Sequence, residues 1–461
     1  MNVGRLQLPE IRVYCRYLVA GPGMILVTVS CATEAIRDEK APMTSVADVA
    51  LGNPAVQSPA STFVGRRYVQ LVVVLGALMA IGPLTIDTYL PALPQLSSEM
   101  GATDSQVQLT ITGLLVGLGF GQLIIGPLSD AFGRRKPLLI GLGAHGGMSL
   151  LCAAAPSIGL LAVTRTLQGL AGAAVAVVVM AVVRDLFTGI RAAQLLSRLI
   201  LVLGVAPILA PSLGSALLNV TSWRGIFVAL ALAAVALWVL AWRALPETLP
   251  AASRQPASAR SSIRAYGRLF SDPMFLVMVG VAGLMFATLF AYVAGAPFLL
   301  QERYGLSPQT FGLVFSANAV GLIVMTQLNP VLVGRFGPVR VISVGVLAAL
   351  TGAVGLLITA LTNFGGLLGF MLPLFFVVSA AGLSFPNAPA IALSRHGDIA
   401  GTAAAVLGAA QFMIGGSIAP LVGTLSDGTP LPLATIIVCT TGLAAGLFWS
   451  VRRRMLDRDD G

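Results

Sequence analysis

The chain has 461 residues, of which 56% are hydrophobic and 10% are charged, and its mean hydropathy is +0.90. Soluble domains carry about 25% charged residues, so this composition excludes a soluble globular protein and predicts a membrane protein. The formal net charge is +10. Where those charges lie decides whether they indicate membrane topology or an anionic partner such as a nucleic acid.

Apolar runs follow one another along the chain from Val69 onward. Each is about 20 residues long, enough for a helix to cross a hydrocarbon core about 30 Å thick. The predicted fold is therefore an all-α membrane protein with twelve transmembrane helices. Their approximate limits are 69–92, 107–128, 137–156, 160–183, 193–218, 223–243, 273–296, 308–330, 339–360, 365–388, 400–423 and 432–450.

Lys and Arg gather in alternate loops between these runs. They prefer the cytoplasmic side of short loops. With the segment before the first span placed inside, the inner loops and C-terminal tail hold twenty, and the outer loops hold two, Arg224 and Arg303. Both termini are thus predicted to be cytoplasmic, in the inner membrane of a bacterium. The basic charge then reflects topology, and no nucleic-acid partner is expected.

Residues 1–68 precede the first span and are predicted to form a cytoplasmic tail. The stretch 17–32 is apolar and is followed by small residues, as in a signal peptide. A span there would invert every loop charge described above, so an irregular tail, or a translation start assigned too far upstream, agrees better with the charges. Residues 43–64, rich in Ser, Ala, Pro and Val, are typical of a flexible segment.

The longest internal loop, 244–272, is rich in Ser, Pro, Ala and Arg and is predicted to be a cytoplasmic linker that can lie against anionic lipid. It divides a six-helix bundle, 69–243, from a second bundle with a basic tail, 273–461. "APSLG" at 210–214 recurs as "APLVG" at 419–423, and "DAFGRRK" at 130–136 has a weaker echo in "GRFGPVR" at 334–340. Two pseudo-symmetric bundles around a central cavity are a common transporter plan.

Two motifs resemble signatures of the major facilitator superfamily. "GPLSDAFGRRK" (126–136) resembles its loop pattern G-x-L-x-D-x-x-G-R-[RK]-[RK], and "LAVTRTLQGLAGA" (161–173) resembles its span-4 pattern L-x-x-x-R-x-x-Q-G-x-x-A-A. The stretches at 86–94, 294–302 and 400–416 resemble the bicyclomycin and chloramphenicol resistance (Bcr/CflA) branch of its drug:proton antiporters. The resemblance implies alternating access of the two bundles.

The loop motif is also a candidate conformational latch. Gly126 and Gly133 permit a tight turn, and Asp130 sits at the membrane face, where the positive end of a neighbouring helix can pair with it. The resemblance implies that, in the outward-facing state, Asp130 faces the start of the eleventh helix, residues 399–402, and is bridged by Arg134. The alternative is that the basic residues of the motif serve topology alone.

Two charged residues are candidates for proton coupling. Asp87 is the only Asp or Glu well inside a predicted span, and Arg165 lies at a compatible depth in the fourth span. A charge in hydrocarbon costs from about 3 kcal/mol upward, so such residues usually face a bundle interior. Two alternatives stay open: Asp87 caps a helix break near Pro83 and Pro91, and Arg165 snorkels to an interface. Resemblance to the family's span-4 arginine, implicated in proton coupling, favours the cavity for Arg165.

The fifth span, 203–218, corresponds to the signature that the family associates with antiport. Ala210 and Ser215 replace glycines of that pattern, while Pro207, Pro211 and Gly214 keep the elements of a kink and of close helix approach.

Further residues are candidates for a substrate cavity or for packing. Tyr89, Phe286, Tyr292 and Phe412 could line an apolar cavity, although aromatic residues more often fill helix contacts. Gly113, Gly117 and Gly121 form a small-residue stripe whose usual meaning is helix packing and whose other use is sliding during transport.

The cysteines and histidines have no metal-ligand spacing, and the chain has no nucleotide-binding loop. We therefore expect no metal, no cofactor and no catalytic residue, with a proton gradient as the energy source. The predicted function is proton-coupled efflux of drugs or other small amphipathic molecules by a monomer. Transport of a physiological metabolite is the alternative with the same fold; a membrane-embedded enzyme or a non-transporting sensor agrees less well.

Overall fold

The computed structural model describes residues 65–254 and 259–459, and the regular elements within them are all helical. The predicted tail at 1–64 lies outside the described residues. The long helices of the N-terminal half are α2 (Arg66–Asp87), α4 (Asp104–Phe132), α5 (Arg135–Ala153), α6 (Ile158–Leu186), α7 (Gly189–Leu218) and α8 (Trp223–Ala244). Those of the C-terminal half are α10 (Pro273–Phe298), α11 (Pro308–Phe336), α12 (Pro338–Thr362), α13 (Gly366–Leu393), α14 (Ala400–Leu425) and α15 (Leu431–Asp459).

Eleven of the described helices are long and apolar enough to cross a membrane. The predicted span at 137–156 corresponds to α5, which has 19 residues and contains Lys136, His145 and four glycines. With these residues α5 is not among the eleven. It packs between α6 and α8 along its length, so it belongs to the same bundle as its more apolar neighbours.

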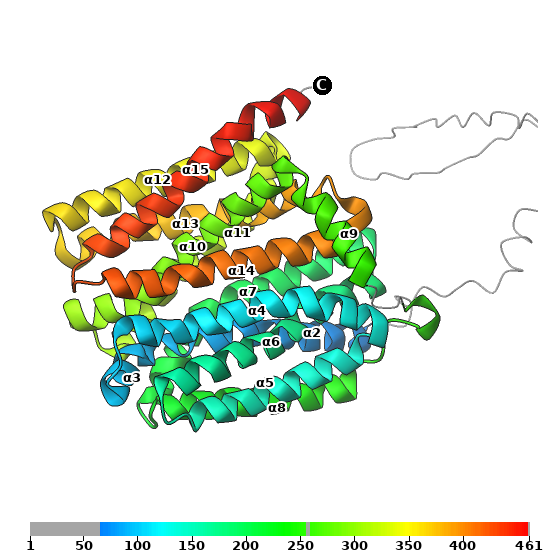
Figure 1. Cartoon of the computed structure of the whole chain (residues 1–461), viewed down its shortest axis with the longest axis horizontal. Coiled ribbons are helices and arrows are strands. Elements are labelled where there is room, and N and C mark those ends of the chain that lie inside the picture. Colours follow the sequence, from blue (N-terminus) through cyan, green and yellow to red (C-terminus); the bar gives the residue numbers. More distant parts are fainter. Residues whose placement is uncertain (1–64, 255–258, 460–461) are drawn as a thin grey trace, which may run out of the picture. The chain divides into compact units, whose positions relative to one another are not determined.

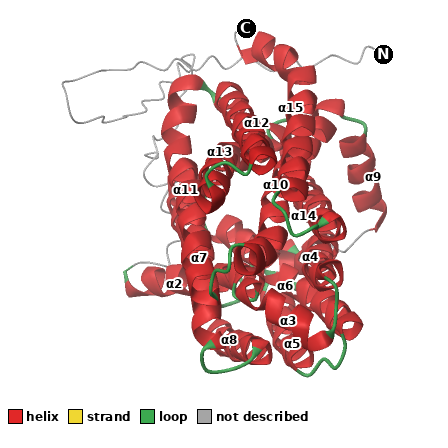
Figure 2. Cartoon of the chain, turned by 90° about the vertical axis from the view of Figure 1, so that its left-hand side faces the viewer, coloured by secondary structure: helices red, strands yellow, loops and turns green. Residues whose placement is uncertain are grey.

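The two halves repeat the same set of neighbours. In the N-terminal half α2 packs on α7, α4 and α5 on α6, and α5 on α8; the equivalent C-terminal pairs are α10 with α14, α11 and α12 with α13, and α12 with α15. The halves meet through α4 with α14 and α7 with α11. Figure 1 shows α4 and α14 side by side, and Figure 2 shows α7 beside α11. The fold is thus two pseudo-symmetric six-helix bundles, as predicted.

The loop motif at 130–136 and its echo at 334–340 each contain the end of a helix, and the two helices end in the same way. Gly133 follows α4 with φ +88°, and Gly337 follows α11 with φ +78°. L-residues with a side chain rarely adopt positive φ, so glycine is needed where the chain leaves the helix this sharply. The second helix of each half therefore ends on an equivalent glycine, although Asp130 in the first copy has Gly334 as its counterpart.

The predicted first span is broken. α2 ends at Asp87 and is followed by a 3-10 turn, η2 (Leu90–Ala92), and a short helix, α3 (Leu93–Met100). Pro91 lies within the turn and, lacking a backbone N–H, interrupts helical hydrogen bonding there. The break places Asp87 at a helix end inside the protein.

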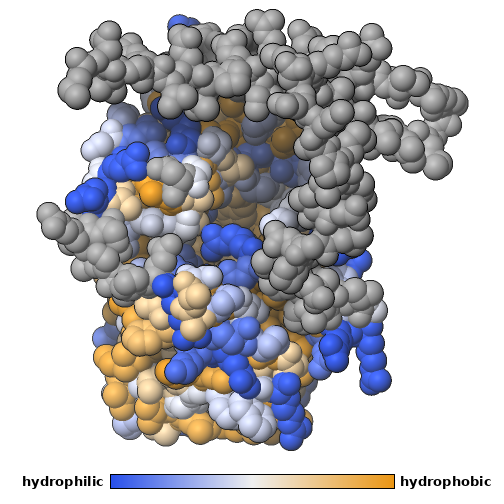
Figure 3. Space-filling model, turned by 90° about the vertical axis from the view of Figure 1, so that its right-hand side faces the viewer, coloured by the Kyte–Doolittle hydropathy of each residue, from blue (hydrophilic) through white to orange (hydrophobic). Residues whose placement is uncertain are grey.

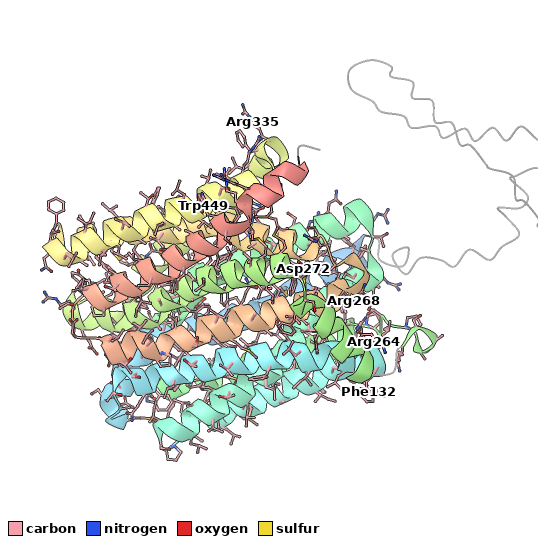
Figure 4. All side chains as sticks on the ribbon, turned by 45° about the horizontal axis from the view of Figure 1, so that its top comes forward. Phe132, Arg264, Arg268, Asp272, Arg335 and Trp449 are labelled. Carbon is pink, nitrogen blue, oxygen red and sulfur yellow. The ribbon has the colours of Figure 1, made fainter. Side chains whose placement is uncertain are left out.

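The predicted linker contains helical structure of its own. A 3-10 turn, η3 (Ala251–Ser253), precedes α9 (Ala259–Phe270), and α9 packs on α10 and α14. Figure 4 shows Arg264 and Arg268 of α9 at the same end of the molecule as Asp272, which precedes α10, and Phe132, the last residue of α4. Part of the linker is therefore docked on the C-terminal half.

The glycine stripe of α4 is a packing surface against α6. A Cβ atom at Gly117 would lie 2.0 Å from the carbonyl oxygen of Thr166, and one at Gly121 would lie 2.5 Å from Cβ of Ala173. The approach is reciprocal, since a Cβ at Gly169 of α6 would lie 2.0 Å from the carbonyl oxygen of Leu114. Both helices belong to one half, so the stripe holds that half together and is not a sliding surface between halves.

Gly117→Ala is expected to lower the free energy of unfolding by about 1–3 kcal/mol, because the added methyl group meets backbone atoms that cannot rotate away. Thermal unfolding of the purified protein in detergent measures this. Gly147→Ala on α5, where a Cβ would have nothing within 4 Å, is the matched control and should be neutral or stabilising by up to about 1 kcal/mol. Equal effects of the two variants would contradict this account of the stripe.

Candidate functional site

Asp87 is buried at the end of α2 and has no polar partner. Its exposure is 7%, and within the described residues it makes no hydrogen bond and no ion pair. The helix does break here, but the carboxylate receives no hydrogen bond, so the geometry does not support a capping role. Burying a charged carboxylate without a partner is costly, which makes Asp87 a place where a proton or a cation would be bound strongly.

Asp87 interacts electrostatically with a titratable group of the other half. Its charge acts on the phenol of Tyr292, on α10. The Tyr292 hydroxyl accepts a hydrogen bond from Nδ2 of Asn318 on α11 at 3.0 Å, and the Tyr292 ring stacks on Phe315 at 5.0 Å between centroids. Oδ1 of Asn318 is buried without a partner. The phenol that interacts with Asp87 is therefore held by a hydrogen bond and a stacked ring within the C-terminal half.

Arg165 is fully buried in α6, with 0% exposure. Nη1 donates to the carbonyl oxygen of Thr85 at 3.2 Å and to Oε1 of Gln168 at 2.8 Å. The guanidinium carbon lies 4.9 Å from the ring centroid of Tyr89 and 5.5 Å from that of Phe227. A carbonyl, an amide and aromatic faces thus replace part of the water around the charge, while Nε and Nη2 are buried without a hydrogen-bond partner. Because the side chain is fully buried, the alternative in which Arg165 snorkels to an interface is wrong.

Asp87 is the last residue of α2 and Arg165 contacts the last turn of that helix, but the two side chains do not form an ion pair. Within the described residues Arg165 forms no salt bridge, and it contacts α2 through the carbonyl of Thr85, two residues before Asp87. Any influence of Arg165 on Asp87 therefore acts through space and through the backbone of the broken helix.

A histidine missed as a site residue completes the network around Arg165. His145, on α5, lies 3.2 Å from Oγ1 of Thr85 through Nε2 and 3.3 Å from the carbonyl oxygen of Gln168 through Nδ1. Nε2 of Gln168 donates to Oγ of Ser149 at 2.7 Å. Helices α2, α5 and α6 are joined by these buried polar contacts. The signal in the sequence was a histidine inside a predicted span.

The four predicted cavity aromatics separate into two groups. Tyr89 and Tyr292 are fully buried beside Arg165 and Asp87 respectively. Phe286 and Phe412 pack against each other in an aromatic cluster, with ring centroids 5.2 Å apart in a T-shaped arrangement. Aromatic packing thus accounts for the second pair.

The fifth helix, α7, packs directly on the break in α2. A Cβ at Gly214 would lie 2.0 Å from the carbonyl oxygen of Thr88, so only glycine lets the two backbones come this close. Pro207 and Pro211 lie within the same helix, and the carbonyl oxygen of Pro211 lies 3.3 Å from where a Cβ at Gly312 of α11 would be. The antiport-type motif thus positions the residue next to Asp87 and contacts the other half.

Arg134 is the centre of the predicted latch. Its Nε donates to Oδ2 of Asp185 at 2.8 Å, and its Nη1 donates to Asp130 and to Oγ of Ser129. Burial works against the charged guanidinium, but the two carboxylates outweigh burial and raise the pKa of Arg134 above its ordinary value. Arg134 therefore joins α4 to the end of α6; its partners here are not at the start of α14, residues 399–402.

The beginning of the linker is fastened to the same loop. Oε1 of Glu247 accepts a hydrogen bond from the backbone N–H of Arg134 at 2.8 Å, and Oε2 accepts one from Arg135 at 3.3 Å and lies 3.8 Å from Nη2 of Arg254. A Cβ at Gly133 would lie 2.3 Å from Oε2 of Glu247. Gly133 is thus needed for both the turn and the approach of Glu247. The predicted role of Gly126 in the turn is wrong, because Gly126 lies inside α4 and a Cβ there would meet nothing within 4 Å.

The two ends of the bundle differ in how the halves are joined. Far from Asp130, the side chains of Gln108 and Thr112 donate to the carbonyl oxygens of Ala294 and Gly416 at 3.0 and 2.7 Å. Within the described residues, the hydrogen bonds between halves all lie on this side of Thr112 in α4 and of Ile208 in α7. Figure 3 looks onto the end with Asp130, where hydrophilic residues lie among apolar ones on the visible part of the described surface.

Comparison with known proteins identifies the family. Residues 70–420 match the model of the Major Facilitator Superfamily. The "Uncharacterized MFS-type transporter YdgK" of Bacillus subtilis is 35% identical, over 86% of this chain and 98% of that protein. The "Bicyclomycin resistance protein homolog" of Haemophilus influenzae is 28% identical over 84% and 97%, and the "Chloramphenicol resistance protein" of Pseudomonas aeruginosa is 31% identical over 77% and 83%.

A solved structure shows the same fold. The xylose transporter XylE from E. coli, in a partially occluded inward-open conformation, aligns with a TM-score of 0.64 at 17% identity, covering 83% of this chain and 96% of that one. Together with the two six-helix bundles, the match to the family model and the relatives named for drug resistance, this establishes the predicted resemblance. The chain belongs to the Major Facilitator Superfamily.

Proposed function

We propose that the chain exports drug-like or other small amphipathic molecules in exchange for protons, by alternating access of its two halves. The names of the bicyclomycin, chloramphenicol and multidrug resistance relatives support this substrate class. The observation that carries the coupling is Asp87, a buried carboxylate without a polar partner at a helix break. In this proposal the transporter is a monomer, uses the proton gradient as its energy source and needs no cofactor.

The proposed exchange depends on competition for Asp87. A proton removes the charge and so removes the cost of burying it, and a cationic or polar group of the substrate does the same by pairing with it. Both cannot occupy the carboxylate together. The charge of Asp87 also interacts with Tyr292 in the other half. Loss or return of that charge therefore changes the interaction between the halves, which links the occupancy of Asp87 to the conformation of the protein.

The proposed membrane orientation follows the loop charges, with the Asp130 end cytoplasmic. The hydrogen bonds between halves then close the outer end, and the described arrangement is the state closed to the outside. The expected pairing of Asp130 and Arg134 with the start of α14 belongs to the opposite, outward-facing state. In this arrangement Arg134 is held instead by Asp185.

Asp87→Asn is expected to abolish drug-stimulated proton movement in vesicles containing the purified protein, because the amide cannot take up and release a proton at neutral pH. Binding of a cationic drug at this carboxylate should weaken, because the charge that pairs with it is lost, while thermal stability should persist. Asp427→Asn, which changes an exposed carboxylate outside the helices, is the matched control and should behave as the parent. Parental coupling in Asp87→Asn would overturn the mechanism while leaving the family assignment intact.

The latch predicts that Asp185 contributes mainly to stability and Asp130 mainly to transport. Asp185 is 15% exposed and Asp130 55% exposed. Asp185→Asn should therefore lower the free energy of unfolding by about 1–3 kcal/mol, and Asp130→Asn by less than about 1 kcal/mol. Asp130→Asn should nevertheless slow transport at least about fivefold, since its partner in the other state is lost. Thermal unfolding and transport assays separate the two effects. Parental transport by a stable Asp130→Asn would contradict the latch.

A further inference from the structure

A polar cavity lies between the halves at the end opposite Asp130. Its volume is about 350 Å³. The N-terminal half contributes the start of α4, and the C-terminal half contributes the end of α10, the π-helical turn η4 (Leu299–Arg303) and the segment between α14 and α15. This cavity is far along α4 from the latch, and neither Asp87 nor Arg165 lines it.

Two carboxylates, one from each half, line this cavity. They are Asp104, at the start of α4, and Glu302, in η4, and they are close enough to repel each other electrostatically. Neither forms an ion pair within the described residues. Arg303 also lines the cavity but lies in no salt bridge with either of them. Two unpaired like charges across an interface form a site that a cation would stabilise.

A buried amide at the same cavity points to a ligand independently. Gln108 is 1% exposed; its Nε2 donates to the carbonyl oxygen of Ala294, while its Oε1 has no partner. That oxygen lies 2.5 Å from where a Cβ at Gly423 would be, so the glycine of the repeated "APLVG" makes room for it. Buried acceptors without a donor are rare in native structures, and an occupant that donates a hydrogen bond or brings positive charge would satisfy this one.

The remaining walls are suited to an apolar body. Phe298, Leu299, Val422 and Leu433 line the cavity beside the acids. A bare divalent ion fits poorly, since the described residues contain no group of three or more His, Cys, Asp or Glu able to hold a metal. An ammonium group carried on an apolar skeleton uses both the charge and the walls.

We infer that this outer cavity binds organic cations and is a second substrate site, distinct from that around Asp87. The inference rests on the proposed function and narrows its substrate class to amphipathic cations. Because its walls come from both halves, a cation there bridges Asp104 and Glu302 only while this end is closed. Opening this end separates the two carboxylates, which weakens binding and releases the cation.

Binding of benzyltrimethylammonium to the full-length protein in nanodiscs tests the site, measured by isothermal titration calorimetry against empty nanodiscs. Asp104→Asn and Glu302→Gln should each weaken binding by about three- to tenfold, because each removes one partly exposed attractive charge. Arg303→Gln should tighten binding by about two- to fivefold, since it removes a repulsive one. Glu99→Gln, which changes a carboxylate of α3 that does not line the cavity, is the matched control and should leave the affinity unchanged.

Two further results separate this site from the central one. Asp87→Asn should retain binding that depends on Asp104 and Glu302, even though it loses proton coupling. If Asp104→Asn with Glu302→Gln leaves the affinity unchanged while Asp87→Asn abolishes it, the outer site is overturned and the proposed function stands. If the parent binds the cation through Asp104 and Glu302 but moves no proton with any drug, the proposed function fails and the outer site stands.

Discussion

The cost of removing charge from water organises the N-terminal half. Arg165 is fully buried, and the surrounding helices replace part of its hydration with a carbonyl from α2, an amide from its own helix and two aromatic faces, while Nε and Nη2 stay without a hydrogen-bond partner. Those groups are in turn fixed by their own contacts, among them the link from Gln168 to Ser149 on α5. Moving any of these helices would leave a guanidinium charge unsolvated in the hydrocarbon region, so Arg165 couples the positions of α2, α5 and α6 more firmly than apolar packing alone can.

Asp87 lies two residues beyond the α2 carbonyl that Arg165 contacts, and it has fewer polar contacts than Arg165. The break in α2 carries it to the interior, and Gly214 brings α7 against the residue that follows it, yet no donor is supplied. Arg165 is stabilised by fixed dipoles, whereas Asp87 is left to a mobile partner. This contrast is the physical basis for assigning a structural role to one charge and an exchanging role to the other.

The sequence predicts the twelve helices, the two bundles and the loop motif well, because each depends on local signals: hydropathy, loop charge and the spacing of Gly and Asp. It predicts contacts between distant segments less well. Nothing in the spacing of Asp185 or Glu247 indicates that both fasten the loop at Arg134, and the polar surroundings of His145 and Asn318 arise only when α5 and α11 meet their neighbours. Phe286 and Phe412 show the converse, since aromatic composition alone does not distinguish a cavity wall from a packed cluster.

The repeated pairing of helices has a consequence for how the halves meet. Helix two of each half contacts helix five of the other, α4 with α14 and α11 with α7, which is the geometry of an isologous dimer whose two subunits have been joined into one chain. In such a dimer each charge at the interface would occur twice. Here the position of Asp130 is occupied by Gly334 in the second copy. The two halves therefore keep twofold packing, but only the N-terminal half carries this charge. A single chain allows that asymmetry, whereas a homodimer of identical subunits does not.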